Sequence, residues 1–132
     1  MASGPSGRYG LLALLEALPT VPGVVGAVLS TEEGLPLAAR VREDQDEEAL
    51  AAAAAVLGQL GARASADSEL GPLKLLCLEA SRLRFIVRPV SLGHLLVLVD
   101  YSADFEQVLT AMQGAVAALE TAALAIENSF AA

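Results

Sequence analysis

The chain has 132 residues, a hydrophobic fraction of 55%, a mean hydropathy of +0.56 and a formal net charge of −8. This length suits one domain, which can bury about two-thirds of its unfolded surface without disulfides or metals. The acidic balance argues against a nucleic-acid or anionic-membrane partner, because both need a basic surface. No apolar run reaches the roughly 18 residues of a membrane span, so membrane insertion is not expected. The high apolar fraction instead indicates an oligomer.

The N-terminus and the reactive residue types give few functional signals. Residues 1–7 have neither the basic nor the apolar region of a signal peptide, so we expect a flexible lead, one domain over 8–132, and a cytoplasmic location. Cys77 is the only cysteine and lies in an apolar run, which predicts a buried, unreactive thiol. His94 is the only histidine and lies at a predicted hairpin, where we expect a solvated turn residue rather than a metal ligand.

The first half of the chain begins with a short helix and two strands. Leucines recur at helical spacing before two prolines end the helix: Leu11, Leu14, Leu15 and Leu18. Residues 23–30 are apolar on both alternating faces, which predicts a strand covered on both sides. Residues 35–41 alternate between apolar and other residues, and Pro36 favours an edge position because proline cannot donate to a ladder.

The alanine-rich segment that follows is predicted to be the central helix, with Asp44 and Glu47 in a capping-box-like pattern. One stripe of this helix is expected to pack on the sheet: Leu50, Ala53, Val56, Leu57 and Leu60. A second stripe has almost no side chain: Ala51, Ala55, Gly58 and Ala62. Small residues let another backbone come close, so we interpret the second stripe as a partner interface. An exposed helix held by propensity alone is the alternative.

The second half predicts a meander and a long helix. Strands are expected at 72–79, 83–90 and 95–99, and the last is apolar on both faces and therefore central. Asp104 is the predicted N-cap of the final helix. The resulting order α-β-β-α-β-β-β-α predicts an α+β fold, a three-layer α/β/α sandwich on a five-stranded antiparallel sheet.

Catalytic chemistry is not indicated anywhere in the sequence. There is no glycine-rich phosphate loop after a strand, so no nucleotide cofactor is expected. The acids at 43–48 lack the spacing of a calcium loop, and a helix start accounts for them. Arg84 and Arg88 could be surface charges or salt-bridge partners of the acids around Glu47. We therefore predict no catalytic, cofactor or metal residues.

Four segments in this order resemble the Roadblock/dynein-light-chain family: 22–30, 34–38, 47–51 and 90–98. The resemblance covers about 11–127 and implies a profilin-like roadblock domain that forms a homodimer or heterodimer, with paired middle helices and sheets joined across a two-fold axis. It also implies a non-enzymatic regulator of Ras-like small GTPases, and the bacterial gliding-motility member, a GTPase-activating protein, is the nearest functional model. A structural adaptor that only dimerises and tethers is the second hypothesis.

The resemblance directs attention to the middle helix as the surface for the second copy and the GTPase. The expected partner contacts are Glu48, Ala52, Ala55 and Gln59, with the small stripe Ala51, Ala55, Gly58 and Ala62 at the dimer interface. An arginine finger is poorly supported, because Arg82 is the only loop-borne candidate within the folded body. Any activation of a GTPase is therefore expected to act by reshaping the partner.

Overall fold

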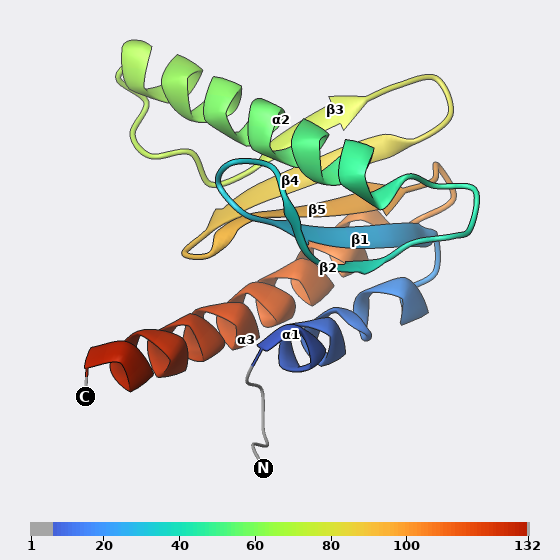
Figure 1. Cartoon of the computed structure of the whole chain (residues 1–132). Helices are drawn as coiled ribbons and strands as arrows, with labels where there is room; N and C mark the ends of the chain where they lie inside the picture. The colour runs from blue at the N-terminus through green and yellow to red at the C-terminus, as the bar shows by residue number, and fades with distance from the viewer. Residues whose placement is uncertain (1–6, 132) are drawn as a thin grey trace.

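The computed structural model describes the backbone of residues 7–131 and the side chains of residues 10–129. Its elements, in order, are α1 (Gly7–Leu15), the 3-10 helix η1 (Leu18–Thr20), β1 (Val24–Ser30), β2 (Pro36–Arg40), α2 (Glu47–Asp67), β3 (Leu76–Glu79), β4 (Arg84–Val90), β5 (Gly93–Val99) and α3 (Phe105–Ala131) (Figure 1). The expected flexible lead lies outside the described residues except for Gly7, where α1 begins. The order of α-helices and strands matches the predicted one, but α1 ends at Leu15, and Leu18, which was predicted in the first helix, lies in η1.

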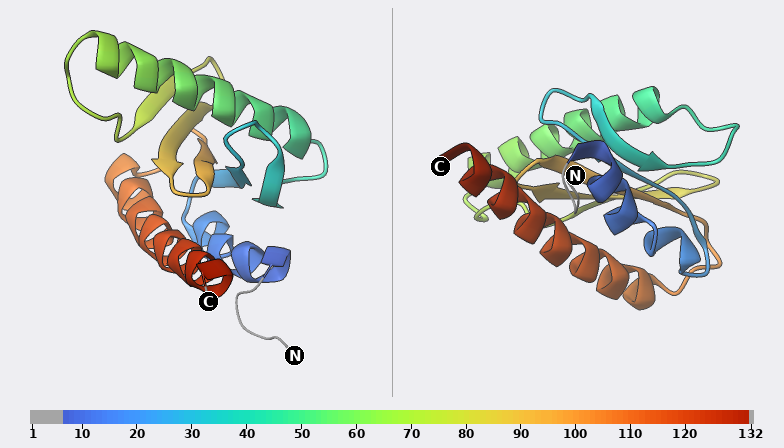
Figure 2. Two further views of the ribbon diagram at one scale, coloured as in Figure 1. Left: turned by 60° about the vertical axis from the view of Figure 1, so that its left-hand side comes forward. Right: turned by 60° about the horizontal axis from the view of Figure 1, so that its bottom comes forward.

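The five strands form one antiparallel sheet in the order β2-β1-β5-β4-β3. Every residue of β1 and β5 is buried, as expected for strands that are apolar on both faces. β2 lies at one edge, as Pro36 predicted, and β3 lies at the other. Figure 2 shows α2 on one face of the sheet and α1 with α3 on the opposite face, so the predicted mixed α/β fold is confirmed.

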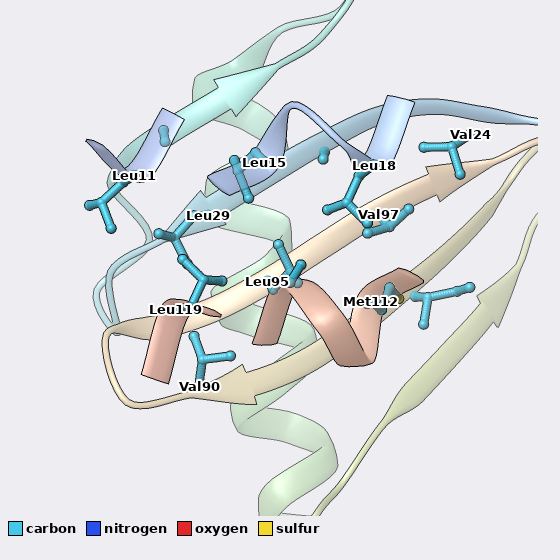
Figure 3. Close-up of a cluster of buried hydrophobic side chains, with 14 of the residues drawn as sticks. Leu11, Leu15, Leu18, Val24, Leu29, Val90, Leu95, Val97, Met112 and Leu119 are labelled. Carbon is cyan, nitrogen blue, oxygen red and sulfur yellow. The ribbon is translucent and has the colours of Figure 1, made fainter. Parts of the chain in front are cut away.

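The larger hydrophobic core lies between the sheet and the pair α1 and α3 (Figure 3). Leu15 of α1, Leu95 of β5 and Leu119 of α3 are fully buried there. Asp104 begins α3 as predicted, because its Oδ1 accepts hydrogen bonds from the backbone N–H groups of Glu106 (3.0 Å) and Gln107 (3.3 Å). The aliphatic side chains of this core hold α1 and α3 against the sheet.

A smaller core lies under α2, on the other face of the sheet. Its buried members are Val25, Ala54, Val87, Leu96 and Leu98. The N-cap of α2 is Asp46 rather than Asp44, since the Asp46 carboxylate accepts from the backbone N–H groups of Glu48 and Ala49 at 3.0 and 3.1 Å. The helix therefore starts two residues later than the capping-box pattern predicted.

Among the residues that the structure describes, two helices are long and apolar enough, by length and composition alone, to cross a membrane: α2 and the Phe105–Ser129 part of α3. Both pack one side against the sheet. In each helix 28% of the apolar window is buried in the fold.

Candidate interaction surface

The structure divides the two predicted stripes of α2 differently from the prediction. Of the stripe expected to pack on the sheet, Leu50 and Leu57 do pack against the smaller core. Ala51, Ala55 and Gly58 are buried against the sheet. Val56 and Leu60, which were expected in the core, are each 62% exposed. The expectation that the small stripe faces away from the sheet is therefore wrong. The physical reason is that a helix surface of Ala and Gly lets the helix lie close to the strands, so the larger side chains of α2 are either partly buried beside this contact, as Leu50 and Leu57 are, or exposed.

The seven predicted interface residues divide between the two sides of α2. Ala51, Ala55 and Gly58 belong to the interior of this chain, so an arginine at position 55 would disrupt the fold rather than report on an interface. The other four are exposed: Glu48, Ala52, Gln59 and Ala62. Of these, Gln59 has a defined contact, because its Nε2 donates to the Glu32 backbone carbonyl at 2.7 Å.

The exposed side of α2 forms an uncharged apolar surface. We call the exposed residues Ala49, Ala52, Val56, Gln59, Leu60 and Ala62 the outer α2 face. No charged residue occurs between Glu48 and Arg63. Solvated helices normally carry Lys and Glu at such positions, so a surface of this kind is typical of a protein contact.

Other exposed apolar side chains flank the outer α2 face. Leu35 precedes β2, Leu70 follows α2, and Leu78 lies on the α2 side of β3, opposite Phe85 of β4. An open, mainly apolar groove adjoins the C-terminal end of the helix; Ala62, Ala66, Leu73 and Pro89 are among its lining residues. The apolar surface thus extends from α2 toward the β3 edge of the sheet.

Strand β3 is a short edge strand, and it changes the interpretation of Cys77. β3 pairs only with β4 in the sheet, and its residue Cys77 is exposed. The predicted buried placement is therefore wrong, because an apolar run cannot distinguish an edge strand from a central one. Partial desolvation and the neighbouring Glu79 carboxylate raise the pKa of the Cys77 thiol, although Arg84 opposes them.

Exposure predicts that Cys77 reacts under native conditions. N-ethylmaleimide should modify one thiol in the folded chain, as measured by mass spectrometry, and more slowly than in the guanidinium-unfolded chain at the same pH, because the raised pKa reduces the thiolate fraction. As the pH rises, the modification rates of the folded and the unfolded chain should become more similar. A thiol that reacts only after unfolding would contradict the exposed placement of Cys77.

The structure decides between the two alternatives for Arg84. Its Nε lies 3.0 Å from Oε2 of Glu79, and its guanidinium lies 4.5 Å from the centre of the Tyr101 ring. Arg84 and Ile86 lie on the same face of β4, which is the face that α3 covers, whereas Glu47 begins α2 on the opposite face of the sheet. Arg84 is therefore not a partner of the acids around Glu47. Arg82 is exposed at the β3–β4 bend.

His94 is buried rather than solvated. It is the second residue of β5 and shares the α2 face of that strand with Leu96 and Leu98, so α2 covers it. The prediction of a turn residue is wrong. The period of two along β5 places residues 94, 96 and 98 on one face of the strand, but only the position of α2 determines that this face is covered at residue 94.

The described part of the chain contains no group of three or more His, Cys, Asp and Glu side chains that could hold a metal ion. Two polar contacts order the acidic segment before α2: Asp46 caps the helix, and the Gln45 side chain accepts from the Arg42 backbone N–H at 2.9 Å. The side chains that the outer α2 face exposes are mainly apolar.

Comparison with known proteins places this geometry in a family. The family model of the Roadblock/LC7 domain matches residues 11–100. No curated protein sequence matches the chain. A Roadblock/LC7 domain from Streptomyces avermitilis is similar in structure, with a TM-score of 0.79, 23% identity and coverage of 86% of this chain and 97% of that one.

Two MglB structures are also similar. Myxococcus xanthus MglB has a TM-score of 0.82 at 12% identity, covering 95% of this chain and 96% of that one. An MglB with a tetrameric arrangement has a TM-score of 0.79 at 17% identity, covering 92% and 91%. At these identities the likeness establishes the fold alone, whereas the family model covers more than half of the sequence. The chain belongs to the Roadblock/LC7 domain family.

Proposed function

We propose that this chain is a non-enzymatic, dimeric regulator of a Ras-like small GTPase. The observation that carries the proposal is the outer α2 face, which exposes Val56 and Leu60 and has no charged residue between Glu48 and Arg63. Family membership supports it, because roadblock domains are generally non-catalytic regulators. A cytoplasmic location is part of the proposal, since that is where such GTPases act.

In the proposed homodimer, the outer α2 faces of two copies lie against each other and the β3 edges join the two sheets. The β3 edge suits this role because its backbone pairs with β4 on one side only, and unpaired strand edges readily accept another strand. The tetrameric arrangement of one similar MglB shows that this fold supports assembly in that protein. The paired helices would then form one continuous surface for the GTPase.

The acidic start of α2 would contribute to binding by steering. Glu43, Asp44, Asp46 and Glu48 are exposed at the end of the helix that adjoins the outer α2 face. Complementary charge raises the association rate with a basic surface more than it raises affinity. If the protein activates its partner, the proposal is that binding reorders the GTPase's own catalytic groups, with no arginine finger from this chain.

The test compares two arginine substitutions at equally exposed leucines. Leu60→Arg lies on the outer α2 face, and Leu124→Arg lies on α3, where Leu124 is 60% exposed. Leu60→Arg should weaken dimerisation by about 100-fold or more, because the interface would bury an unpaired charge. Leu124→Arg should leave it unchanged. Sedimentation equilibrium measures both, and equal behaviour of the two variants would contradict the placement of the interface.

A second experiment tests GTPase binding with a Ras-like GTPase whose gene lies beside the gene for this chain. Titration calorimetry should give different affinities for its GTP-analogue and GDP forms, because a regulator must distinguish the two states in order to shift them. Ala52→Arg, on the same exposed side, should weaken binding to the preferred form. Equal affinity for both forms would favour the second candidate function, a structural adaptor that tethers partners without affecting GTP turnover.

A further inference from the structure

Of the glycines in α2, Gly58 approaches the sheet most closely, and the residue that it meets there is His94. His94 is 5% exposed. A Cβ placed on Gly58 would lie 2.1 Å from Cδ2 and 2.3 Å from Nε2 of the His94 ring. The imidazole therefore occupies the space that a side chain at position 58 would need, and the middle of α2 rests directly on the ring.

The hydrogen bonding of this ring suits its neutral form. Nδ1 of His94 is buried and has no hydrogen-bond partner among the described residues. A neutral imidazole can leave that nitrogen as an unprotonated acceptor, but an imidazolium must donate from both nitrogens. Ser30, the register partner of His94 on β1, directs its hydroxyl to the Thr31 carbonyl at 3.0 Å instead. Protonation of the ring would thus bury a donor without an acceptor.

The charged groups around the ring do not reverse this preference. The side of α2 that faces the sheet carries only apolar residues at its buried positions, β1 supplies Ser30, and β4 supplies Pro89 as the register partner of His94. Glu32, in the β1–β2 turn beside exposed Glu33, is the nearby carboxylate. Burial lowers the pKa of His94. The Glu32 charge and, less strongly, the polar backbone of Thr31 raise it, and each of these effects is smaller than that of burial.

The same segment of α2 also holds the β1–β2 turn. Gln59, next to Gly58, donates to the Glu32 carbonyl at 2.7 Å. A Cβ on Gly34 of the turn would lie 3.2 Å from Cα of Ala52, so the turn lies close to the helix backbone. His94, this turn and the Ala52–Gln59 part of α2 therefore form one packed unit, and that part of α2 includes much of the outer α2 face.

We propose that His94 is a proton-controlled latch: its neutral ring seats the middle of α2 and the β1–β2 turn on the sheet, and protonation on acidification releases them. The latch is a property of the single chain. Its consequence, that acidification weakens contacts made through the outer α2 face, rests on the proposed function.

The direction of the pH effect follows from the lowered pKa. In the open state His94 titrates near its usual value of about 6.5, and in the closed state it titrates below that value. The closed state is fully favoured above about pH 6.5 and loses stability as the pH falls from there to the closed-state pKa. Within that window the opening constant should rise by up to tenfold per pH unit.

The first experiment is NMR on the chain freed of any affinity tag. His94 is the only histidine, so one imidazole signal reports its titration. The midpoint should lie below about 6.5. Glu32→Gln should lower it further, because the opposing carboxylate is removed, and the exposed neighbour Glu33→Gln should have a smaller effect. A midpoint at or above the usual histidine value would overturn the latch.

The second experiment measures amide exchange, corrected for the intrinsic rate at each pH. Protection of the α2 amides around Gly58 should fall by up to tenfold per pH unit below about 6.5, while α3 stays protected. His94→Gln should remove the pH dependence, and Glu32→Gln should move its lower limit to lower pH. Parallel loss in α2 and α3, or an unchanged pH dependence in His94→Gln, would refute the latch.

Sedimentation of the same samples separates the latch from the proposed function. If the dimer of the natural chain dissociates over the same pH window while the dimer of the His94→Gln variant stays intact, the latch is coupled to assembly. An intact dimer throughout the window contradicts that coupling and leaves the latch standing. A chain that is monomeric at neutral pH contradicts the proposed homodimer, and the NMR and exchange results then decide the latch alone.

Discussion

Gly93→Ala should cost about 3 kcal/mol or more of unfolding free energy, a large share of the roughly 5–15 kcal/mol available to a domain. A Cβ at this position would lie 1.9 Å from the Ser30 carbonyl oxygen and 2.7 Å from the Thr31 carbonyl carbon. Both are backbone atoms of the neighbouring segment, so no side-chain rotation relieves the overlap. The φ of +151° adds strain that an L side chain rarely accepts.

The matched control is Gly71→Ala, in the connector between α2 and β3. Gly71 also has a positive φ, of +95°, but a Cβ added to it would meet nothing within 4 Å. The substitution should therefore cost only the backbone strain, about 1–2 kcal/mol. Thermal unfolding followed by circular dichroism measures both variants. Similar losses in the two would show that backbone strain, rather than the contact with β1, determines the requirement for glycine at position 93.

Gly58→Ala should destabilise the protein even though alanine is the better helix former. The ring of His94 has to move to admit the methyl group, and overpacking of this kind costs about 1–3 kcal/mol. That cost should outweigh the roughly 1 kcal/mol that alanine contributes in a helix interior. Gly114→Ala in α3 is the control, because its Cβ would meet nothing within 4 Å. Gly114→Ala should stabilise, so the same substitution should have opposite signs in two helices.

A double-mutant cycle identifies the source of the Gly58 effect. In a His94→Ala background the ring is absent, so Gly58→Ala should no longer destabilise, and the coupling between the two positions should be of order 1–3 kcal/mol. Chemical denaturation of the four proteins measures it. Additive effects, or a Gly58→Ala variant as stable as Gly114→Ala, would mean that α2 does not rest on the ring.

The two stripes of α2 show what a helical wheel can predict and what it cannot. The wheel separated two stripes of α2 and indicated that both are apolar, which is correct and which predicts contacts on two sides of the helix. It placed Val56 and Leu60 on the sheet, because they are more hydrophobic than Ala51 and Gly58, and for these four residues that choice is wrong. That choice depends on how closely the helix can approach the strands, and on the His94 ring beneath it.

Local sequence determined the order of the elements, the double burial of β1 and β5, the edge position of β2 and the Asp104 cap of α3, since each rests on neighbouring residues and their period. The tertiary structure alone decided the exposure of Cys77 and the burial of His94. Exposure of Cys77 follows from β3 lying last in the sheet, and burial of His94 follows from α2 crossing that end of β5. Both depend on which distant segments become neighbours, and a residue's own sequence context does not contain that information.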